Sequence, residues 1–419
     1  MKIIIVGLGT VGFSVTETLV KKGCDIAIIE KDETLFQNAS EKLDVLAIHG
    51  SGISSDNLVA AGIENADVVI AATDRDEVNI MVCALAKQLG VKTRIARLFS
   101  DEYTKKTTAV DINELGVTNY IIPELLTVEN IKQYIETPGA TAVASFGDQQ
   151  ILLRGSKLGS GSKLINTRIK ENELLTDAKE PLLIAGIDKE NEFIIPSGDY
   201  SFEENDNVLT LLLANSYQKF YKLFNLTETK VKKVILSGAS LLGIKTAQML
   251  EKQIPQVILI ENNAEMAEKA ATLLNKTKII KGNYDDEGLF DSLNIETADF
   301  FIAVHKKTSD NMMAAMLAKE CGAKKTMVIT TDSRHQRLFN SIGINHIVNP
   351  YMLTSSAILD VVRSDLINNI TELSNGQVEA MELIVEKNSK IDGKELKSIW
   401  KKIHFPCQFL RLTKVLLHL

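Results

Sequence analysis

Short apolar runs rich in β-branched residues alternate along the chain with stretches in which apolar positions recur at helical spacing. Because strands of a parallel sheet are buried on both faces and their crossover helices on one, this alternation predicts β-α-β units. In the first such region we predict strands at 2–6, 25–30, 44–48, 67–72, 92–98 and 119–122. Helices are expected between them, near 10–22, 33–42, 55–62, 75–89 and 103–115. Six strands of this kind favour a doubly wound α/β sheet, the Rossmann-type fold.

The same unit occurs a second time in the chain. Residues 2–19 align with residues 233–250 at an offset of 231 residues, which places Gly7 opposite Gly238. Further aligned pairs, with one residue added after the second strand, are Gly12 with Gly243, Glu30 with Glu261, Gly50 with Gly282, Asp67 with Asp299 and Asn79 with Asn311. A repeat of this length predicts two copies of one fold.

The segment between the two copies has a different pattern. A helical pattern over 124–136 ends at Pro138-Gly139, and short strand-like runs then surround one helical stretch up to about residue 220. Pro and Gly mark a boundary, and the mixture predicts a small α+β domain. We expect Rossmann-type domains at 1–137 and 223–370, an α+β domain at 138–222 and a second one at 371–419. The last is expected to be truncated or aberrant, because only some 44 residues remain after its expected start near Gly376, where the first has about 80.

Length and composition narrow the class of protein. A chain of 419 residues exceeds the roughly 250–300 residues at which a single core stops growing, so several domains are expected. No apolar run approaches the roughly 20 residues of a membrane span, and the first residues make a poor signal peptide. The net charge of −7 argues against a general nucleic-acid binder. We expect a soluble protein with no nucleic-acid partner.

The cysteines and histidines are isolated from one another. The four cysteines form no CxxC pair and have no histidine at metal-ligand spacing, which argues against a disulfide framework or a zinc site and fits a reducing cytosol: Cys24, Cys83, Cys321 and Cys407. The six histidines are equally scattered, and surface or structural roles are favoured for them over catalysis.

A glycine loop follows the first strand and opens the first helix: Gly7-Leu8-Gly9-Thr10-Val11-Gly12. The first glycine permits the tight turn, the second lets the backbone approach a pyrophosphate, and the third lets helix and strand pack closely. The free N–H groups of the helix N-terminus favour an anion there. Glu30 ends the next strand and is expected to accept ribose hydroxyls and repel a 2′-phosphate, which favours NAD(H) or an adenine nucleotide over NADP(H). The alternative is that the glycines serve only the turn and Glu30 is solvated.

Further contacts are expected from the carboxyl ends of the neighbouring strands, where ligands bind in open α/β sheets. The candidates are Gly50, Ser51, Thr73, Asp74 and Arg97. Arg97 is suited either to a phosphate or to a salt bridge with a nearby carboxylate, and the sequence leaves both open.

The second glycine loop keeps the first and third glycines but has Ser240 where the first loop has Gly9. A side chain is then expected to face the path of a pyrophosphate. Glu261 is kept as the acidic partner, whereas His305-Lys306 replaces Thr73-Asp74. The sequence leaves open whether this loop binds a nucleotide through Gly238, Ala239, Ser240, Leu241, Leu242 and Glu261.

Nearly the whole chain resembles the TrkA family, the peripheral cytosolic subunits of bacterial Trk potassium uptake systems. The resemblance rests on KIIIVGLGTVG at the start, ADVVIAATDRDEVNIM at 66–81, RIARLFSDEY at 94–103, IIPSGD at 194–199, ADFFIAV at 298–304 and DNMMAAMLAKECGAKK at 310–325. It implies RCK N-domains for the Rossmann units and RCK C-domains for the small ones, with NAD(H) and ATP or ADP as ligands. It also implies a homo-oligomeric ring, a tetramer of tandem chains, under a TrkH- or TrkG-like membrane translocation subunit at the inner face of the cell membrane.

Carried over residue by residue, the family's first nucleotide site falls on Gly7 to Gly12, Glu30, Thr73, Asp74 and Arg97. The second falls on Gly238 to Leu242 and Glu261. Two features depart from the family's pattern: Ser240 in the second loop, and the tail from about His404, which does not resemble the end of an RCK C-domain. The resemblance implies a nucleotide-sensing regulator and not an enzyme.

An NAD-dependent oxidoreductase is the alternative, because the same glycine fingerprint serves dehydrogenases. An oxidoreductase also needs a group that donates or accepts a proton at the substrate. The candidates form no recognisable acid–base spacing: Asp74, Tyr103, Lys105 and Lys106. A scaffold that has lost nucleotide binding is a third reading, and the intact glycines and Glu30 argue against it.

Overall fold

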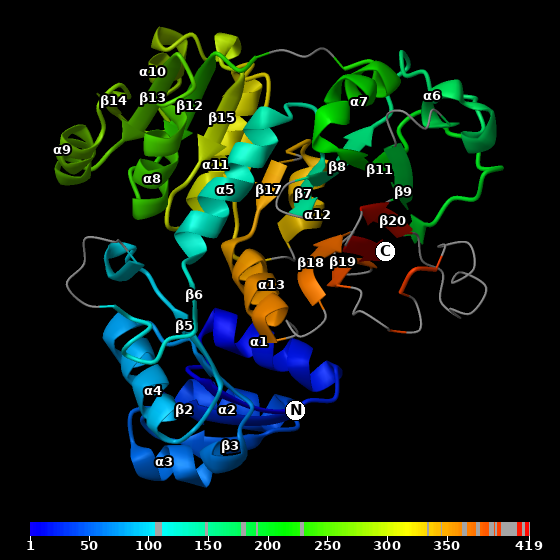
Figure 1. Ribbon diagram of the computed structural model, residues 1–419. Helices are drawn as coiled ribbons and strands as arrows, with labels where there is room; N and C mark the ends of the chain where they lie inside the picture. Colours follow the sequence, from blue (N-terminus) through cyan, green and yellow to red (C-terminus); the bar gives the residue numbers. More distant parts are fainter. Residues whose placement is uncertain are drawn as a thin grey trace. The chain divides into compact units, whose positions relative to one another are not determined.

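The computed structural model describes most of the chain and divides it into two compact units (Figure 1). The first unit consists of Met1–Leu126 and Pro350–Asp365, and the second of Thr127–Asn349 and Leu366–Leu419. The described residues are 1–104, 111–146, 150–176, 182–189, 192–226, 230–332, 335–344, 346–362, 367–373, 378–384, 389, 392–394, 409–412 and 415–418.

The first unit contains a six-stranded parallel sheet in the order β3-β2-β1-β4-β5-β6. Its strands are β1 (Lys2–Val6), β2 (Asp25–Glu30), β3 (Leu46–His49), β4 (Val68–Ala71), β5 (Thr93–Arg97) and β6 (Asn119–Ile121). The central strand β1 is apolar on both faces, and Ile3, Ile4 and Ile5 are fully buried. The predicted doubly wound sheet is confirmed.

In the described connections between these strands, four helices occur: α1 (Thr10–Lys21), α2 (Glu33–Lys42), α3 (Ser55–Ala60) and α4 (Asp76–Gln88), with a 3-10 turn at Ile63–Asn65. The sequence supplies the caps of two of them. The Asp32 carboxylate accepts the N–H of Leu35 at the start of α2, and the Ser54 hydroxyl accepts that of Asn57 at the start of α3.

The helix predicted near 103–115 is wrong in its described part. Glu102–Thr104 forms a single 3-10 turn, residues 112–116 form turns, and 105–110 lie outside the described residues. The Asp111 carboxylate accepts the backbone and side-chain N–H groups of Asn113, and Gly116 has a φ of +106°. These local side-chain bonds compete with a helix, which the apolar spacing alone did not reveal.

Helix α13 (Pro350–Val362) follows the second copy of the repeat in sequence but belongs to the first unit. It lies against α1 on one face of the first sheet (Figure 1). Ile358, Leu359 and Val362 join the apolar core formed there by α1 and the strands, and Ile358 is fully buried. A helix distant in sequence thus completes this core.

The second unit contains the second parallel sheet, in the order β14-β13-β12-β15-β16-β17. Its strands are β12 (Lys233–Ser237), β13 (Gln256–Glu261), β14 (Lys278–Lys281), β15 (Phe300–Ala303), β16 (Thr326–Ile329) and β17 (His346–Val348). Its helices are α8 (Leu241–Leu250), α9 (Ala264–Leu273), α10 (Glu287–Ser292), α11 (Thr308–Glu320) and α12 (Gln336–Ser341), with a 3-10 turn at Ile295–Thr297. The predicted second copy is confirmed.

Helix α5 (Pro123–Glu136) follows the first copy in sequence and continues into the second unit. Its residue Tyr134 is buried, and its ring meets the edge of His346 at the start of β17, with ring centroids 5.4 Å apart. Helix α5 therefore packs in the unit of the second sheet, as α13 packs in the unit of the first.

A smaller antiparallel sheet in the second unit has the order β10-β9-β11-β8-β7. It consists of β7 (Ala142–Phe146), β8 (Ile151–Lys157), β9 (Leu182–Lys189), β10 (Glu192–Ile194) and β11 (Asn207–Leu213). The short helices α6 (Glu173–Thr176) and α7 (Tyr217–Phe224) and 3-10 turns at Ile169–Glu171 and Ala214–Ser216 accompany it. This is the predicted α+β arrangement.

The end of the chain adds a four-stranded antiparallel sheet, β18-β19-β21-β20. Its strands are β18 (Ile367–Leu373), β19 (Val378–Ile384), β20 (Phe409–Leu412) and β21 (Val415–His418). Ala380 is buried in one core with Ala144 and Phe146 of β7. Residues 395–408, which include the start of the atypical tail at His404, lie outside the described residues.

Candidate nucleotide-binding sites

The first glycine loop lies between the end of β1 and the start of α1. Gly7 has a φ of +91°, and a Cβ there would lie 2.8 Å from the backbone of Thr73. Gly12 lies on the inner side of α1, where a Cβ would clash with the carbonyl oxygen of Gly7. Both positions therefore require glycine for the turn and for the close approach of helix and strand.

Gly9 differs from the other two glycines because a Cβ at this position would meet no atom within 4 Å. The residue is exposed and occupies the N-cap position of α1, without a side chain that could cap the helix. The protein's own packing does not require glycine here. A requirement for it would come from a ligand that approaches the open side of the loop.

The first turn of α1 presents free backbone donors beside Gly9. Among the described residues, the N–H groups of Thr10, Val11 and Gly12 have no hydrogen-bond acceptor, and the first bond of the helix is donated by Phe13 to the Gly9 carbonyl oxygen. No acidic residue lies in this turn. Free N–H groups and the positive end of the helix dipole together favour an anion at this position.

The carboxylate of Glu30 lies at the end of β2, next to this loop, and is buried. Its Oε2 accepts the N–H of Leu8 at 2.5 Å, and its Oε1 accepts the N–H of Asp32 at 2.8 Å. The sequence predicted an acidic partner but not these two bonds. They fix the carboxylate beside the loop, and each oxygen keeps a lone pair for a further donor.

Thr73, directly after β4, is held by an asparagine that the sequence did not single out for this task. The buried Asn79 side chain accepts the Thr73 N–H at 2.9 Å and the Thr73 hydroxyl at 2.7 Å. Its amide donates to the carbonyl oxygens of Thr73 at 3.2 Å and Arg97 at 2.8 Å. Asn79 thus ties the ends of β4 and β5 together, and its alignment with Asn311 was the available signal.

Arg97 ends β5 at the same edge of the sheet. Its buried Nε has no hydrogen-bond partner among the described residues, and its guanidinium lies 4.3 Å from the centroid of the Phe99 ring. Burial lowers the pKa of Arg97, while the negative charges of Glu124 and Asp76 act in the opposite direction. Asp76 itself accepts the N–H groups of Phe99 and Ser100 and so fixes the turn after the strand. Two uses of Arg97 were expected, a contact with a phosphate and a salt bridge with a carboxylate. The described residues contain no direct salt bridge of Arg97.

The remaining predicted residues lie at this edge too. The N–H of Gly50, after β3, donates to the Glu30 carbonyl oxygen at 2.8 Å, and the Ser51 carbonyl oxygen accepts the Asn57 side chain at 3.0 Å. Asp74 follows Thr73 and is exposed. The structure therefore brings the residues of the predicted first site to the carboxyl ends of β1 to β5.

The second loop repeats this backbone geometry. Gly238 has a φ of +109°, and a Cβ at Gly243 would clash with the Gly238 carbonyl oxygen. The buried carboxylate of Glu261 accepts the N–H of Ala239 at 2.6 Å and that of Asn263 at 2.9 Å, as Glu30 does in the first copy. The predicted repeat thus extends to the hydrogen bonds of the acidic partner.

The side chains at the second loop are different. The Ser240 hydroxyl donates to the Val304 carbonyl oxygen at 2.6 Å and accepts the Gly243 N–H at 3.2 Å, so it caps α8. The half-buried ring of His305 lies against the loop, with its Nε2 2.8 Å from the Ser237 hydroxyl. Burial lowers the pKa of His305, so the ring is neutral at pH 7.

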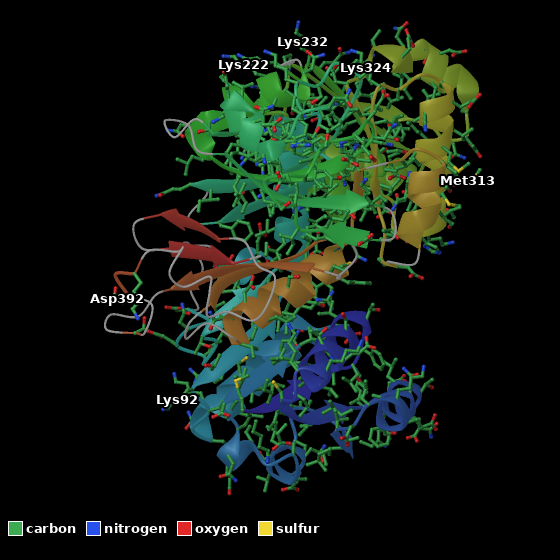
Figure 2. The ribbon with its side chains drawn as sticks, turned by 90° about the vertical axis from the view of Figure 1, so that its right-hand side faces the viewer. Lys92, Lys222, Lys232, Met313, Lys324 and Asp392 are labelled. Atoms are coloured by element: carbon green, nitrogen blue, oxygen red, sulfur yellow. The ribbon has the colours of Figure 1, made fainter. Side chains whose placement is uncertain are left out.

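A small cavity lies at the opposite edge of the second sheet, before β15 and β16. Lys230, Lys324 and Lys325 line it together with Pro138, Val231, Asp299 and Phe300, and its volume is ≈ 70 Å³. Lys232 and Lys324 lie at this end of the unit (Figure 2), and the Asp299 carboxylate accepts the N–H of Lys232 and the ammonium of Lys324. Its lining includes no residue of the second glycine loop.

Two of the four acid–base candidates of a dehydrogenase, Asp74 and Tyr103, lie in the described residues. Burial and the carboxylates of Glu77, Asp76 and Glu102 raise the pKa of Tyr103. Asp74 is exposed, and Lys105 and Lys106 lie outside the described residues. No group of three or more metal-binding side chains, and no helix long and apolar enough to cross a membrane, occurs in the described parts of the chain.

Comparison with known proteins identifies the family. The model of the TrkA-N domain matches twice, at residues 3–123 and 234–350. The Trk system potassium uptake protein TrkA of Vibrio alginolyticus is 31% identical over 407 residues, which cover 95% of this chain and 88% of that protein. The fold is shared with the GsuK RCK domain (TM-score 0.63, 14% identity, 87% of this chain and 76% of that chain) and with the GsuK channel bound to NAD (TM-score 0.63, 13% identity, 86% and 63%). The chain therefore belongs to the TrkA family and carries two TrkA-N domains in tandem.

Proposed function

We propose that this chain is the cytosolic regulatory subunit of a Trk-type potassium uptake system, and that it senses NAD(H) or ATP and ADP. The observation that carries the proposal is the first glycine loop. Three free N–H groups at the start of α1 lie beside the buried carboxylate of Glu30, with an open approach over Gly9. An anionic phosphate needs free N–H donors, and a ribose needs a hydrogen-bond acceptor such as this carboxylate.

In this proposal the pyrophosphate or phosphate chain lies over Gly7 to Gly12 and accepts the free N–H groups of α1. Glu30 accepts ribose hydroxyls through its remaining lone pairs, and Gly50 and Ser51 border the nucleoside. Thr73, Asp74 and Arg97 contact the part of the ligand beyond the phosphates, with the unpartnered Nε of Arg97 as an anion donor. A channel with this fold, the GsuK channel, binds NAD, which supports the choice of ligand.

We also propose that the chain has the four domains expected from its sequence. The two Rossmann domains, RCK N-domains in this reading, span 1–137 and 223–370, and the small RCK C-domains span 138–222 and 371–419. Helices α5 and α13 each pack with the sheet of the other copy. Such an exchange couples the two copies, so a change of shape at one nucleotide site has a route to the other copy.

The bound nucleotide acts by differential affinity and does not react. A ligand shifts a protein between two arrangements only as far as it binds one better than the other, and a coupling of about 1–3 kcal/mol changes affinities about 5- to 150-fold. The name of the Vibrio alginolyticus relative supports potassium uptake as the regulated process.

The partner in this proposal is an integral-membrane potassium translocation subunit, TrkH- or TrkG-like. The chain docks on it from the cytoplasm, peripheral to the inner face of the membrane, as a homo-oligomeric ring, a tetramer of tandem chains. The proposal does not include nucleic acid, in line with the net charge of −7.

Titration of the purified chain with NADH, NAD, ATP and ADP tests the ligand, and potassium flux in vesicles that contain the translocation subunit tests the regulation. We expect saturable binding of at least one of these nucleotides and a flux that changes when it is added together with the chain. Flux that is the same with and without the chain under every nucleotide would reject the regulatory role. Steady consumption of NADH with a small carbonyl compound would instead support the dehydrogenase.

A further inference from the structure

We infer that the second glycine loop is closed to a dinucleotide by its own side chains, so that each chain binds one NAD(H), in the first loop. The inference rests on the proposed function of the first loop and assigns the block in the second to Ser240 and His305. It follows from a comparison of the two copies, whose backbones and acidic partners are matched.

Ser240 places a side chain where the first copy has Gly9 and therefore no side chain. Its hydroxyl uses the Gly243 N–H, whereas the equivalent N–H of Gly12 has no acceptor among the described residues. The same hydroxyl is anchored to the Val304 carbonyl oxygen at 2.6 Å, at the end of β15. The second loop thus offers one donor fewer to a phosphate, and the Ser240 side chain bridges the loop and the neighbouring strand where the first copy has only Gly9.

His305 covers the first turn of the loop. A Cβ at Gly238 would lie 3.1 Å from the His305 Nδ1, which places the ring directly against that glycine. Its Nε2 lies 2.8 Å from the Ser237 hydroxyl, so the ring is held in this position. Thr73, the equivalent residue of the first copy, turns its hydroxyl toward Asn79, and of its side chain only the Cγ2 methyl group, 2.9 Å from where a Cβ at Gly7 would lie, lies against that glycine where the second copy has an imidazole ring.

Tyr284 extends the same block toward the next loop. It aligns with Gly52, which is buried in the first copy, where a Cβ would clash with the side chain of Val6. The Tyr284 ring meets the His305 ring edge to face, with centroids 5.0 Å apart. The aromatic pair therefore joins the segments that follow β14 and β15, across the edge where a nucleotide would lie.

The His305 ring brings no charge that would offset these contacts. Burial lowers the pKa of His305, so at neutral pH the ring adds no positive charge that would attract a phosphate. The first residue of α8 is Leu241, an exposed apolar side chain, where α1 has the polar Thr10. The second copy keeps the architecture of a nucleotide-binding domain. In its loop, however, a side chain of the chain itself, Ser240, already accepts a backbone N–H that a phosphate would use.

The stoichiometry of NADH binding to the full chain tests the inference, measured by calorimetry with protein of known concentration. The wild-type chain is expected to bind one NADH. The double variant Ser240→Gly with His305→Thr, which copies the first loop, is expected to bind two. Adding Leu241→Asp to that variant is expected to return the number to one, because a carboxylate at the first helical position repels the pyrophosphate and is tolerated by the helix dipole.

The matched variant Thr10→Asp places the same charge in the first loop and is expected to abolish NADH binding by the wild-type chain. Two NADH molecules per wild-type chain would overturn the inference and leave the proposed function intact. A double variant that keeps the wild-type circular dichroism spectrum and still binds one NADH would overturn the assignment of the block to Ser240 and His305. Absence of NADH, NAD, ATP and ADP binding by the wild-type chain would reject the proposed function, and the inference with it.

Discussion

The carboxylate of Glu30 and the backbone N–H of Leu8 are joined by a hydrogen bond of 2.5 Å across the start of the first glycine loop. The same carboxylate accepts the Asp32 N–H, so one buried side chain ties the loop after β1 to the loop after β2. Glu261 does the same with Ala239 and Asn263 in the second copy. Glu30 therefore has a structural task in addition to its proposed contact with ribose, and Glu261 has the same structural task.

The first prediction separates these two tasks. Glu30→Ala leaves two N–H groups without their acceptor and removes the charged partner of the ribose, so NADH affinity should fall about 10- to 100-fold. Glu30→Gln keeps the size of the side chain but only one of the two acceptor oxygens, so it should recover part of the thermal stability but not the affinity. Calorimetric titration and thermal unfolding of both variants measure the two effects. Glu33→Gln removes one exposed charge nearby and is the control; equal losses of affinity in it and in Glu30→Gln would count against a ribose contact.

The second prediction concerns Gly7 and Gly9. The protein's own backbone requires glycine at the first position, whereas only a bound ligand would require it at the second. Gly7→Ala forces a side chain into a positive φ and against the backbone of Thr73, so it should destabilise the first unit by at least about 1–2 kcal/mol. Gly9→Ala meets no protein atom within 4 Å and should leave thermal unfolding nearly unchanged, while it lowers NADH affinity. Scanning calorimetry with and without NADH distinguishes the two variants. If Gly9→Ala binds NADH as the wild type does, the ligand does not approach this side of the loop.

The repeat in the sequence was sufficient to predict both parallel sheets, because buried β-branched runs and helical spacing are local properties. The positions of Gly7, Glu30 and Thr73 followed from that prediction, since the carboxyl ends of parallel strands share one edge. The direction of the Ser240 hydroxyl did not follow, because it depends on the distance to the Val304 carbonyl oxygen. Nor did the task of Asn79, which joins the segment after β4 to Arg97 at the end of β5, 18 residues beyond Asn79 in the chain.

The exchange of helices α5 and α13 between the two copies could not be predicted from the sequence either. An amphipathic pattern shows that a helix buries one face, but not which sheet receives that face. Ile358 follows the second copy and is fully buried in the core of the first sheet. The predicted helix near 103–115 was wrong for a related reason, since the side-chain bonds of Asp111 prevailed over the apolar spacing.

The third prediction follows from this exchange. Ile358→Ala removes a fully buried side chain and should destabilise the unit that contains the first sheet by about 2–5 kcal/mol. In scanning calorimetry, the transition that shifts to lower temperature should be the one that NADH shifts upward, because both effects belong to the first unit. Ser356→Ala, on the same helix, is the control. A loss confined to a transition that NADH does not affect would contradict the packing of α13 on the first sheet.

The fourth prediction concerns His346 at the start of β17. The side chain is 9% exposed, its Nε2 has no hydrogen-bond partner among the described residues, and its ring meets Tyr134 and Phe300 edge to face. Burial, and to a lesser extent the positive charge of Lys325, lowers the pKa of His346 from 6.5 to about 4. The ring is therefore neutral in the folded chain throughout the neutral pH range.

The sign of the resulting pH dependence is fixed by the lowered pKa. Between pH 6.5 and about 4 the unfolded chain binds the proton and the folded chain does not, so the stability of the second sheet falls as the pH is lowered through this window. The full contribution is about 3 kcal/mol, and it does not change further below pH 4, where both states are protonated.

Replacement of His346 by leucine removes the titrating group. The unfolding free energy of His346→Leu should therefore rise relative to that of the wild type by about 3 kcal/mol between pH 7 and pH 4. Urea unfolding followed by circular dichroism at several pH values measures this difference, in which the contributions of all other groups cancel. A difference that stays constant over the window would show that His346 titrates alike in both states and is not buried as described.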